Sequence, residues 1–195
     1  MNCLLVVGHP LPQSLCGHLA TVPVRELTAA GHEVTVLDLY GMDFDPRLTP
    51  EERRAYYDAA VGDVGVEGHS DRLRSAEILV LVFPTWWFAM PSIVKGWIDR
   101  VFAPGVAFAH GSDFGPIRPL LGGLRRVVVV TTLGSPWWVD WLVMWRPLPR
   151  TFRRAVIGAC APRAKVDFFS LYSAENPSEK RLRGFERRLS RSLRR

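Results

Sequence analysis

Five short, mostly apolar runs recur along the chain, separated by segments with helical or irregular patterning. The runs are residues 3–7, 34–37, 78–83, 127–130 and 166–169. The first does not alternate between apolar and polar residues, and the fourth is four consecutive valines, so both indicate strands buried on two faces. Five strands separated by helices predict an α/β fold, a doubly wound parallel sheet with helices on both faces. A length of 195 residues with 48% hydrophobic content suits one domain over residues 1–195.

Capping residues and apolar stripes place the helices. Ser14 suits the N-cap of a helix from residue 15 to about 30, which Pro23 is expected to kink or split. Pro91 suits the first turn of a helix that ends at about residue 101. Tryptophans spaced by four would share one side of a further helix: Trp137, Trp141 and Trp145. A last helix, at about 178–195, has an apolar stripe made of Leu182, Phe185, Leu189 and Leu193.

The net charge of +6 is concentrated in that last helix. Residues 178–195 contain eight Lys or Arg and two Glu, a net of +6, so the remainder of the chain is neutral. We favour a solvated helix face for this charge and expect no nucleic-acid binding. The alternative is a peripheral contact between this helix and an acidic partner, nucleic acid or an anionic membrane.

Cysteine and hydropathy patterns indicate the cellular environment. Cys3, Cys16 and Cys160 are far apart, so we expect no disulfide framework, no metal site and a reducing, cytoplasmic location. Cys16 is interpreted as an inert helix residue rather than a reactive thiol. No apolar stretch is long enough to span a bilayer, and the N-terminus lacks a basic segment before its apolar run, so we expect neither a membrane span nor a signal peptide.

An aromatic loop follows the third apolar run. Residues 83–91 read Phe-Pro-Thr-Trp-Trp-Phe-Ala-Met-Pro, a flat apolar wall suited to a planar ligand. In a doubly wound sheet this loop would meet the loops at 8–14 and 131–135 at the carboxyl edge, where ligands bind. Ser14 and the free N–H groups of the helix it caps would bind a phosphate. A phosphate site beside an aromatic slot describes a flavin nucleotide pocket, and the lack of a G-x-G-x-x-G or Walker sequence disfavours other nucleotides.

The sequence resembles the flavodoxin-like NAD(P)H dehydrogenase (quinone) family, which includes the DT-diaphorase type, the drug-activity-modulator type and the ancillary subunits of potassium efflux systems. Residues 83–102 are similar to the family's F-P-x-x-W-F-x-x-P-x-x-x-K-G-W-x-D-R-V-F run. Gly8-His9-Pro10 with Ser14 resembles its A-H-P…S phosphate loop, and residues 131–134 resemble its T-T-G-G. The order and spacing of all three hold over residues 1 to about 171.

The resemblance implies the flavodoxin-like strand order 2-1-3-4-5, a bound FAD or FMN, NAD(P)H as co-substrate, and a homodimer with the flavin near the subunit interface. Residues 40–68 offer cover for an adenine, which favours FAD, although shorter relatives use FMN. The residues that align with flavin phosphate contacts are His9, Gln13, Ser14, Leu15 and Cys16. Those that align with the isoalloxazine wall are Pro84, Thr85, Trp86, Trp87 and Phe88. Those that align with the polar edge of the ring are Thr131, Thr132, Leu133 and Gly134.

Two departures from the family bear on the chemistry. Leu133 replaces the first glycine of T-T-G-G, so the approach of the ring to the backbone can differ. The DT-diaphorase branch uses a Tyr and a His downstream of this loop, but the matching positions here are Val139 and Trp145, and no Tyr or His lies between residues 135 and 149. The catalytic residues therefore stay unassigned, with His110 as a candidate proton donor.

These observations favour a flavin-dependent NAD(P)H:quinone oxidoreductase, in which the flavin transfers two electrons to a quinone or a similar flat acceptor. The alternative is a regulatory flavoprotein subunit that docks on a membrane transporter. The missing Tyr/His pair and the basic last helix agree in part with that alternative.

Overall fold

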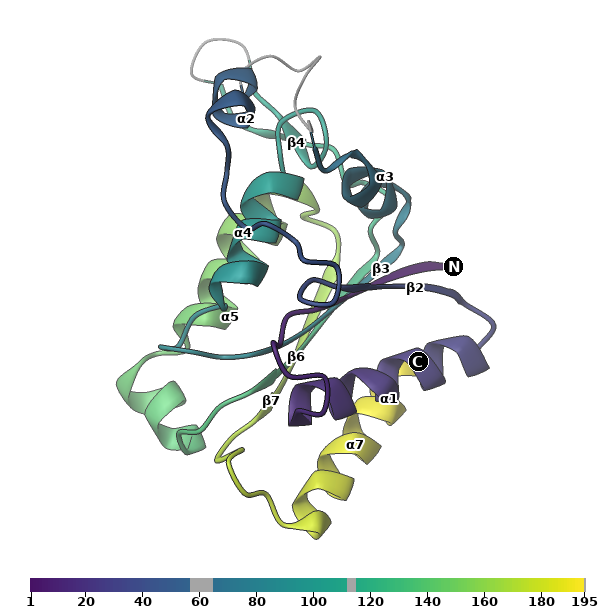
Figure 1. Cartoon of the computed structure of the whole chain (residues 1–195), viewed down its shortest axis with the longest axis vertical. Helices are drawn as coiled ribbons and strands as arrows, with labels where there is room; N and C mark the ends of the chain where they lie inside the picture. The colour runs from purple at the N-terminus through teal and green to yellow at the C-terminus, as the bar shows by residue number, and fades with distance from the viewer. Residues whose placement is uncertain (57–64, 112–114, 195) are drawn as a thin grey trace.

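The central feature of the computed structural model is a parallel sheet of five strands in the order β2-β1-β3-β6-β7 (Figure 1). The structure describes residues 1–56, 65–111 and 115–194. The strands are β1 (Asn2–Val7), β2 (Glu33–Asp38), β3 (Ile78–Pro84), β6 (Arg126–Thr132) and β7 (Lys165–Leu171). Counted within this sheet alone, the order is 2-1-3-4-5, so the predicted fold class and strand order are confirmed.

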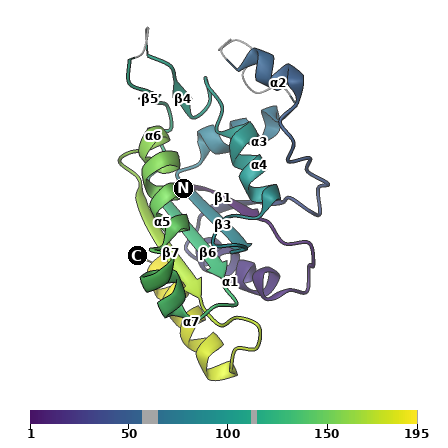
Figure 2. The same cartoon turned by 90° about the vertical axis from the view of Figure 1, so that its left-hand side faces the viewer.

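Helices cover both faces of the sheet, as predicted. On one face, α1 (Leu15–Ala29) and α7 (Glu179–Leu193) lie side by side in Figures 1 and 2. The helices on the other face are α3 (Glu67–Ser75), α4 (Ser92–Val101) and the consecutive helical pieces α5 (Pro147–Thr151), η2 (Phe152–Ile157) and α6 (Gly158–Cys160). A short helix, α2 (Pro50–Ala55), is capped by Thr49 and Glu52.

Two apolar cores result, because side chains alternate across each strand. Leu5, Val80 and Val128 face α1 and α7, whose buried stripe includes Phe185 and Leu189. The neighbouring positions Leu4, Leu79 and Val127 face the opposite core, which contains Trp97 and Phe152. The predicted stripe of the last helix is therefore buried, with Leu182 packed at its margin.

One of the two outcomes predicted for Pro23, a split helix, is not observed, and the prediction for the three tryptophans was wrong. Pro23 does not split α1, which is one helix with Val22 and Leu27 buried on either side of the proline, so packing against the sheet holds it together. Trp145 does not continue the helix of Trp137 and Trp141. That helix contains a π-helical turn, η1 (Val139–Val143), and ends before Trp145, which has a positive φ of 57°.

A hairpin beyond α4 was not predicted from the sequence. Its strands are β4 (Phe108–Ala109) and β5 (Arg118–Pro119), which pair antiparallel. Each strand has only two residues, which is too short for a period-2 pattern to be visible. Residues 112–114, between the two strands, lie outside the described residues. So do residues 57–64, which belong to the 40–68 segment that was predicted to cover an adenine.

Gly96 allows α4 to pack tightly against the segment that contains Pro46. A Cβ at position 96 would lie 2.2 Å from the backbone oxygen of Pro46. Gly96→Ala is therefore expected to destabilise the fold, because a clash of about 1–3 kcal/mol or more outweighs a helix-propensity gain of about 1 kcal/mol. Urea unfolding measures the change. Gly184→Ala in α7 is the matched control, since its nearest neighbour would be an arginine side-chain atom 4.0 Å away, and it is expected to stabilise. Equal effects of the two changes would contradict the packing argument.

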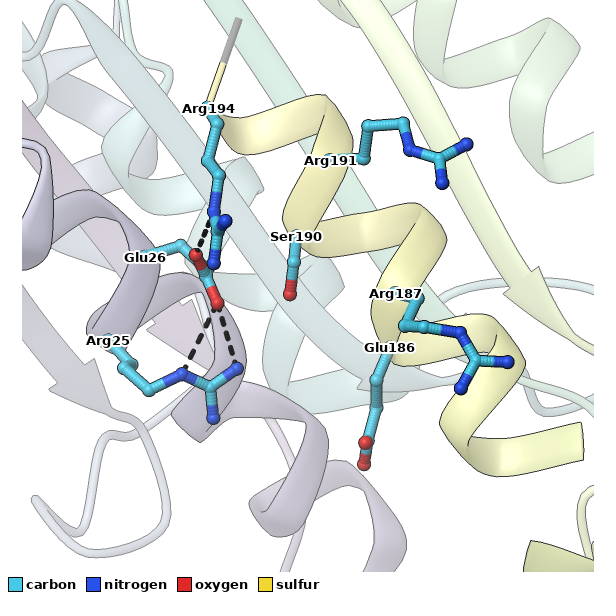
Figure 3. A pocket seen from close by; sticks show the side chains of 7 residues that line it. All are labelled: Arg25, Glu26, Glu186, Arg187, Ser190, Arg191 and Arg194. Carbon is cyan, nitrogen blue, oxygen red and sulfur yellow. Dashed lines mark hydrogen bonds and ion pairs between the residues drawn. The ribbon is translucent and has the colours of Figure 1, made fainter. Parts of the chain in front are cut away.

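Glu26 fastens α7 to α1 through two arginines (Figure 3). Its carboxylate is buried, 4% exposed, and accepts hydrogen bonds from Arg194 Nε at 2.7 Å and Arg25 Nη2 at 2.9 Å. A groove of about 550 Å³ runs beside it, and Arg187 and Arg191 of its lining point away from Glu26. The terminal basic charge of the sequence is thus partly used to hold α7 in place.

The contact between Glu26 and the two arginines predicts that the stability of the fold depends on pH. The hydrogen bond from Arg194, followed by that from Arg25, lowers the pKa of Glu26 from 4.5 to about 2. A lowered folded-state pKa adds stability above the unfolded value, and this stability is lost as the pH falls toward 2. Glu26→Gln is therefore expected to be less stable than the parent at neutral pH and to approach it in acid, as measured by urea unfolding across this range. A difference in stability that stays constant with pH would refute the role given to the carboxylate.

Candidate functional site

Three strand-end loops meet at the carboxyl edge of the sheet because of the strand register. Val7 lies opposite Val82, and Pro84 lies opposite Thr132. The loop after β3 is fixed to β6 by a hydrogen bond of 2.8 Å from Thr85 N to Thr132 O. An open hollow of about 310 Å³ lies between these loops, at the edge predicted to bind the ligand.

Eight of the fourteen predicted cofactor residues line this hollow: His9, Leu15, Cys16, Pro84, Thr85, Trp86, Thr132 and Gly134. Ala174 and Glu175 complete the lining. Gln13 and Ser14 lie on the loop that enters α1, while Trp87 and Phe88 form the tip of the aromatic turn. Thr131 and Leu133 are buried, 1% and 5% exposed, and do not line the hollow.

The first loop presents the N-terminus of α1 to the hollow. Ser14 is the N-cap, and its Oγ accepts a hydrogen bond of 3.1 Å from Gly17 N. N–H groups in the first turn of a helix have no acceptor within the helix, so those of Leu15 and Cys16 are available to an anion. A Cβ at Gly17 would lie 2.2 Å from Pro12 O, so the loop requires a glycine there to fold this tightly over the first turn.

His9 is oriented by its own loop. Leu11 N lies 3.0 Å from His9 Nδ1. Leu11 O lies 3.2 Å from the same nitrogen, so both backbone groups of Leu11 contact the Nδ1 side of the ring, and the tautomer decides which of them forms the hydrogen bond. The ring also lies 6.4 Å from that of Trp86, centroid to centroid, which joins the first loop to the aromatic turn. His9 therefore uses Nδ1 within its own loop and has Nε2 as its second ring nitrogen at the edge of the hollow.

The aromatic turn has a backbone that its residues rarely adopt. Trp86 and Ala89 exchange two backbone hydrogen bonds of 3.2 and 2.9 Å, and the residues between them, Trp87 and Phe88, have φ values of 52° and 56°. Left-handed conformations cost non-glycine residues about 1–3 kcal/mol each and concentrate at functional sites. The side chain of Trp87 is left 96% exposed. The strain and the exposure together mark this turn as a binding element.

Three polar side chains that line the hollow are paired, one of them with the buried Thr131 behind it. Thr85 Oγ1 lies 2.6 Å from Thr131 Oγ1, and Cys16 Sγ lies 3.4 Å from Thr132 Oγ1. Burial raises the pKa of Cys16 to about 11, against a smaller opposing effect of Thr132, so the thiol stays protonated at neutral pH. A protonated thiol is a poor nucleophile, in agreement with the expected inert role of Cys16.

Sequence reasoning missed Ala174 and Glu175. Glu175 brings a carboxylate to the hollow, with Oε1 3.1 Å from where a Cβ of Gly134 would stand. Both residues follow β7, the fifth predicted strand, so applying the strand-end rule to that strand as well would have found them. A carboxylate here can accept hydrogen bonds from ligand N–H groups and repels a phosphate. The Glu175 end of the hollow therefore differs in chemistry from the end formed by the N-terminus of α1, which suits an anion.

His110 lies away from the hollow within the same chain. It follows β4, where its ring contacts those of Phe108 at 5.4 Å and Tyr56 at 6.1 Å. The chain reaches this hairpin through α4, which leads away from the carboxyl edge (Figure 1). The candidate proton donor is thus not brought to the other predicted residues of its own chain.

A tyrosine reaches the segment in which the expected Tyr/His pair is missing. Tyr172 Oη donates to Asp140 Oδ2 at 2.8 Å and accepts from Trp141 Nε1 at 3.1 Å. Burial, followed by the hydrogen bond to Asp140, raises the pKa of Tyr172. Tyr172 borders a groove along β7 rather than the hollow, so the structure gives it the role of holding η1 in place.

A doubly wound sheet of this order, with a helix N-terminus and an aromatic turn where the strand order reverses, defines a flavodoxin-type protein. The family model described as flavodoxin-like fold matches residues 1–153, and the chain belongs to this family. The predicted resemblance is thereby confirmed, since curated homologues are named as quinone dehydrogenases of the NAD(P)H and ribosyldihydronicotinamide types.

Individual relatives agree with the family. Ribosyldihydronicotinamide dehydrogenase (quinone) of Pongo abelii is 39% identical over 148 residues, 68% of this chain and 63% of its own. The crystal structure of Smu.1420 from Streptococcus mutans superposes with a TM-score of 0.85 at 27% identity, covering 100% of this chain and 99% of that one. NAD(P)H:quinone oxidoreductase from Methanothermobacter marburgensis gives a TM-score of 0.80 at 22% identity, covering 98% and 96%, and shows the shared fold alone. The chain spans between 46% and 63% of the length of five such curated relatives.

Proposed function

We propose that the protein binds a flavin nucleotide in the carboxyl-edge hollow and catalyses two-electron transfer from NAD(P)H to a quinone or a similar flat acceptor. The observation that carries the proposal is the convergence of a helix N-terminus, an aromatic turn and two threonine side chains on one hollow. The names of the curated relatives support the same reaction class. Residues 1–195 would act as one flavin-binding domain.

The residues around the hollow match the chemical groups of a flavin nucleotide. The N–H groups of Leu15 and Cys16, with His9 Nε2, would hold the phosphate. Trp86 and the turn behind it would contact the ring face, and Thr132 with Gly134 would border its polar edge. The bound cofactor supplies hydride acceptance and donation, while the chain supplies binding, orientation and exclusion of water. The buried side chain of Leu133 leaves the hollow clear, so its replacement of a family glycine does not block the ring.

The exposed aromatic turn supports the proposal that the protein acts as a homodimer. A Trp87 side chain that is 96% exposed on a strained turn is costly unless a ligand or a second copy covers it. The family resemblance implies a flavin that would lie near the subunit interface. Sedimentation velocity measures the oligomeric state, and a monomer at micromolar concentration with flavin bound would contradict the dimer.

Cofactor release tests the proposed function directly. The purified protein is heated, and the absorbance and mass of the released compound distinguish FMN from FAD. Turnover is then followed with NADH and NADPH, each with several quinones. We expect a flavin at about one per chain and oxidation of at least one nicotinamide that depends on the quinone. A colourless protein that takes up neither FMN nor FAD would refute the proposal.

A regulatory flavoprotein that docks on a membrane transporter is the second candidate. The observation in its favour is the absence of Tyr and His from residues 135–149, where the DT-diaphorase branch has its relay. Under this alternative the protein retains flavin and binds nicotinamide but has negligible turnover with every quinone tested. Turnover that is rapid and depends on a quinone would exclude regulation as the sole role.

A further inference from the structure

The groove beside Glu26 lies between α1 and α7, away from the hollow. Two of its lining residues come from α1 and five from α7: Arg25 and Glu26, then Glu186, Arg187, Ser190, Arg191 and Arg194. Its volume of about 550 Å³ is in the range of pockets that hold small ligands. Arg25 follows Cys16, which lines the hollow, by nine residues of α1, or roughly 14 Å of helix. The groove is therefore separate from the proposed flavin site.

Contacts between α1 and α7 hold the groove in a defined shape. Toward the start of α7, Glu186 Oε1 lies 2.6 Å from His18 Nε2. Toward its end, Arg194 donates to the buried Glu26 at 2.7 Å. The two helices also share one apolar core against the sheet. The groove is thus a preformed feature of the fold, with both of its walls fixed.

The groove has more positive charge than its carboxylates neutralise. Four arginines and two glutamates line it, a net charge of +2. Glu26 is shared by Arg25 and Arg194, yet both arginines keep unused donors, because a guanidinium has five N–H groups. Among the described residues, Arg25 donates only from Nε and Nη2, and Arg194 only from Nε. Their remaining N–H groups are available to a ligand.

The guanidinium groups of Arg187 and Arg191 have no hydrogen-bond or ion-pair partner in the part of the chain that the structure describes (Figure 3). Both side chains are exposed, and they lie four residues apart on α7, where like charges destabilise a helix. The helix dipole favours Arg191 in the last turn but does not extend to Arg187. Two neighbouring cations without a counter-charge, on the wall of a fixed groove, indicate a site that an anion completes.

A small ligand with two phosphate groups matches this arrangement. Guanidinium groups bind phosphate oxygens through paired hydrogen bonds. The groove has two pairs of them, Arg25 with Arg194 and Arg187 with Arg191, so each pair offers donors to one phosphate. Ser190 adds a hydroxyl group to the lining.

A lipid headgroup carries the same phosphate chemistry but suits the groove less well. Neither α1 nor α7, both described over their full length, has an exposed large apolar side chain that would enter a bilayer. In the part of the chain that the structure describes, no helix is long and apolar enough to cross a membrane. The groove therefore favours a ligand in solution.

We propose that the groove between α1 and α7 binds a small ligand that carries a diphosphate group. The proposal does not rest on the flavin chemistry, because no residue of the groove lines the hollow. Isothermal titration calorimetry of the full chain with inorganic pyrophosphate tests it. We expect one site per chain, with an affinity that falls as salt is added. Orthophosphate can engage one arginine pair only and is expected to bind at least about tenfold more weakly.

Arg187→Gln with Arg191→Gln is expected to weaken pyrophosphate binding by at least about tenfold, because both changes remove a charged donor. The two side chains are exposed, so the variant is expected to fold, and circular dichroism checks this. Arg25 and Arg194 are left unchanged, since both hold the buried Glu26.

Lys180→Gln with Arg188→Gln is the matched control. It makes the same charge change on α7, but neither residue lines the groove, so the affinity of the parent is expected to be retained. Equal weakening in both variants would show a general attraction to a basic helix. Unchanged affinity in the Arg187 and Arg191 variant would place pyrophosphate elsewhere, such as at the N-terminus of α1. Either result, or no binding of pyrophosphate, would overturn the proposal.

Two further probes separate the sources of phosphate. Flotation with vesicles of phosphatidylcholine and phosphatidylglycerol measures binding to lipid headgroups, and titration with duplex DNA measures binding to nucleic acid. We expect neither to bind at the salt concentration at which pyrophosphate binds. Vesicle or DNA binding that pyrophosphate displaces would assign the groove to that larger partner and contradict a small ligand.

Discussion

Gly134→Trp is expected to abolish detectable flavin binding and, with it, any quinone-dependent oxidation of NAD(P)H. Gly134 is exposed and lines the hollow of about 310 Å³. Its backbone needs no positive φ, and an added Cβ would meet only the flexible Glu175 side chain at 3.1 Å. The indole would therefore enter the hollow while the fold is retained. A ring in the space of the ligand should weaken flavin binding at least about 100-fold, which corresponds to about 2.7 kcal/mol.

Gly123→Trp is the matched control for this experiment. Gly123 is exposed at the amino end of the same strand, β6, and a Cβ there meets nothing within 4 Å. Both variants carry the same added surface, so a general effect of an exposed tryptophan would appear in each. Titration of the apoprotein with FMN and with FAD measures affinity. Unchanged affinity in Gly134→Trp would remove the hollow as the flavin site without deciding whether the protein binds flavin elsewhere.

The parts of the site that could be predicted from the sequence depend on local patterns. Apolar runs such as Leu4-Leu5-Val6-Val7 located the strands, because burial on two faces forbids polar residues along them. The loops after the first, third and fourth runs met as expected, since the register places Pro84 beside Thr132. Ser14 capped α1 because its neighbours in sequence alone determine that hydrogen bond.

The features that the sequence did not reveal depend on contacts between distant residues. Tyr172 reaches Asp140 across 32 positions of the chain, and this contact helps to hold η1, where a tryptophan spacing of four had suggested a regular helix. Glu26 and Arg194 are separated by 168 positions, so a stretch that looked like a solvated basic tail is partly a structural contact. The burial of the Leu133 side chain also depends on distant residues. Its backbone is hydrogen-bonded to Leu171 of β7 and to Ala174 in the loop that follows β7.

Trp97→Ala is expected to cost about 3–5 kcal/mol of the free energy of unfolding, the largest stability effect predicted for this chain. Trp97 belongs to the K-G-W run of the family motif and is fully buried in the core beneath α4. Its ring meets that of Phe102 edge to face at 5.8 Å, and its indole N–H donates to His69 Nδ1 at 3.2 Å. The substitution removes both contacts and leaves a cavity that α4 cannot close while Gly96 holds it against Pro46.

Trp97→Phe separates the two contributions and keeps the test usable if the alanine variant does not fold. Phenylalanine retains most of the packing but has no N–H group, so His69 loses its donor and the expected cost falls to about 1–3 kcal/mol. Urea unfolding of both variants against the parent gives the comparison. Trp97 is buried in the core and does not line the hollow. The Trp97→Phe variant is therefore expected to keep the flavin affinity of the parent while its free energy of unfolding falls. A fall in affinity as large as that of Gly134→Trp would instead show that α4 transmits changes in its packing to the aromatic turn from which it starts.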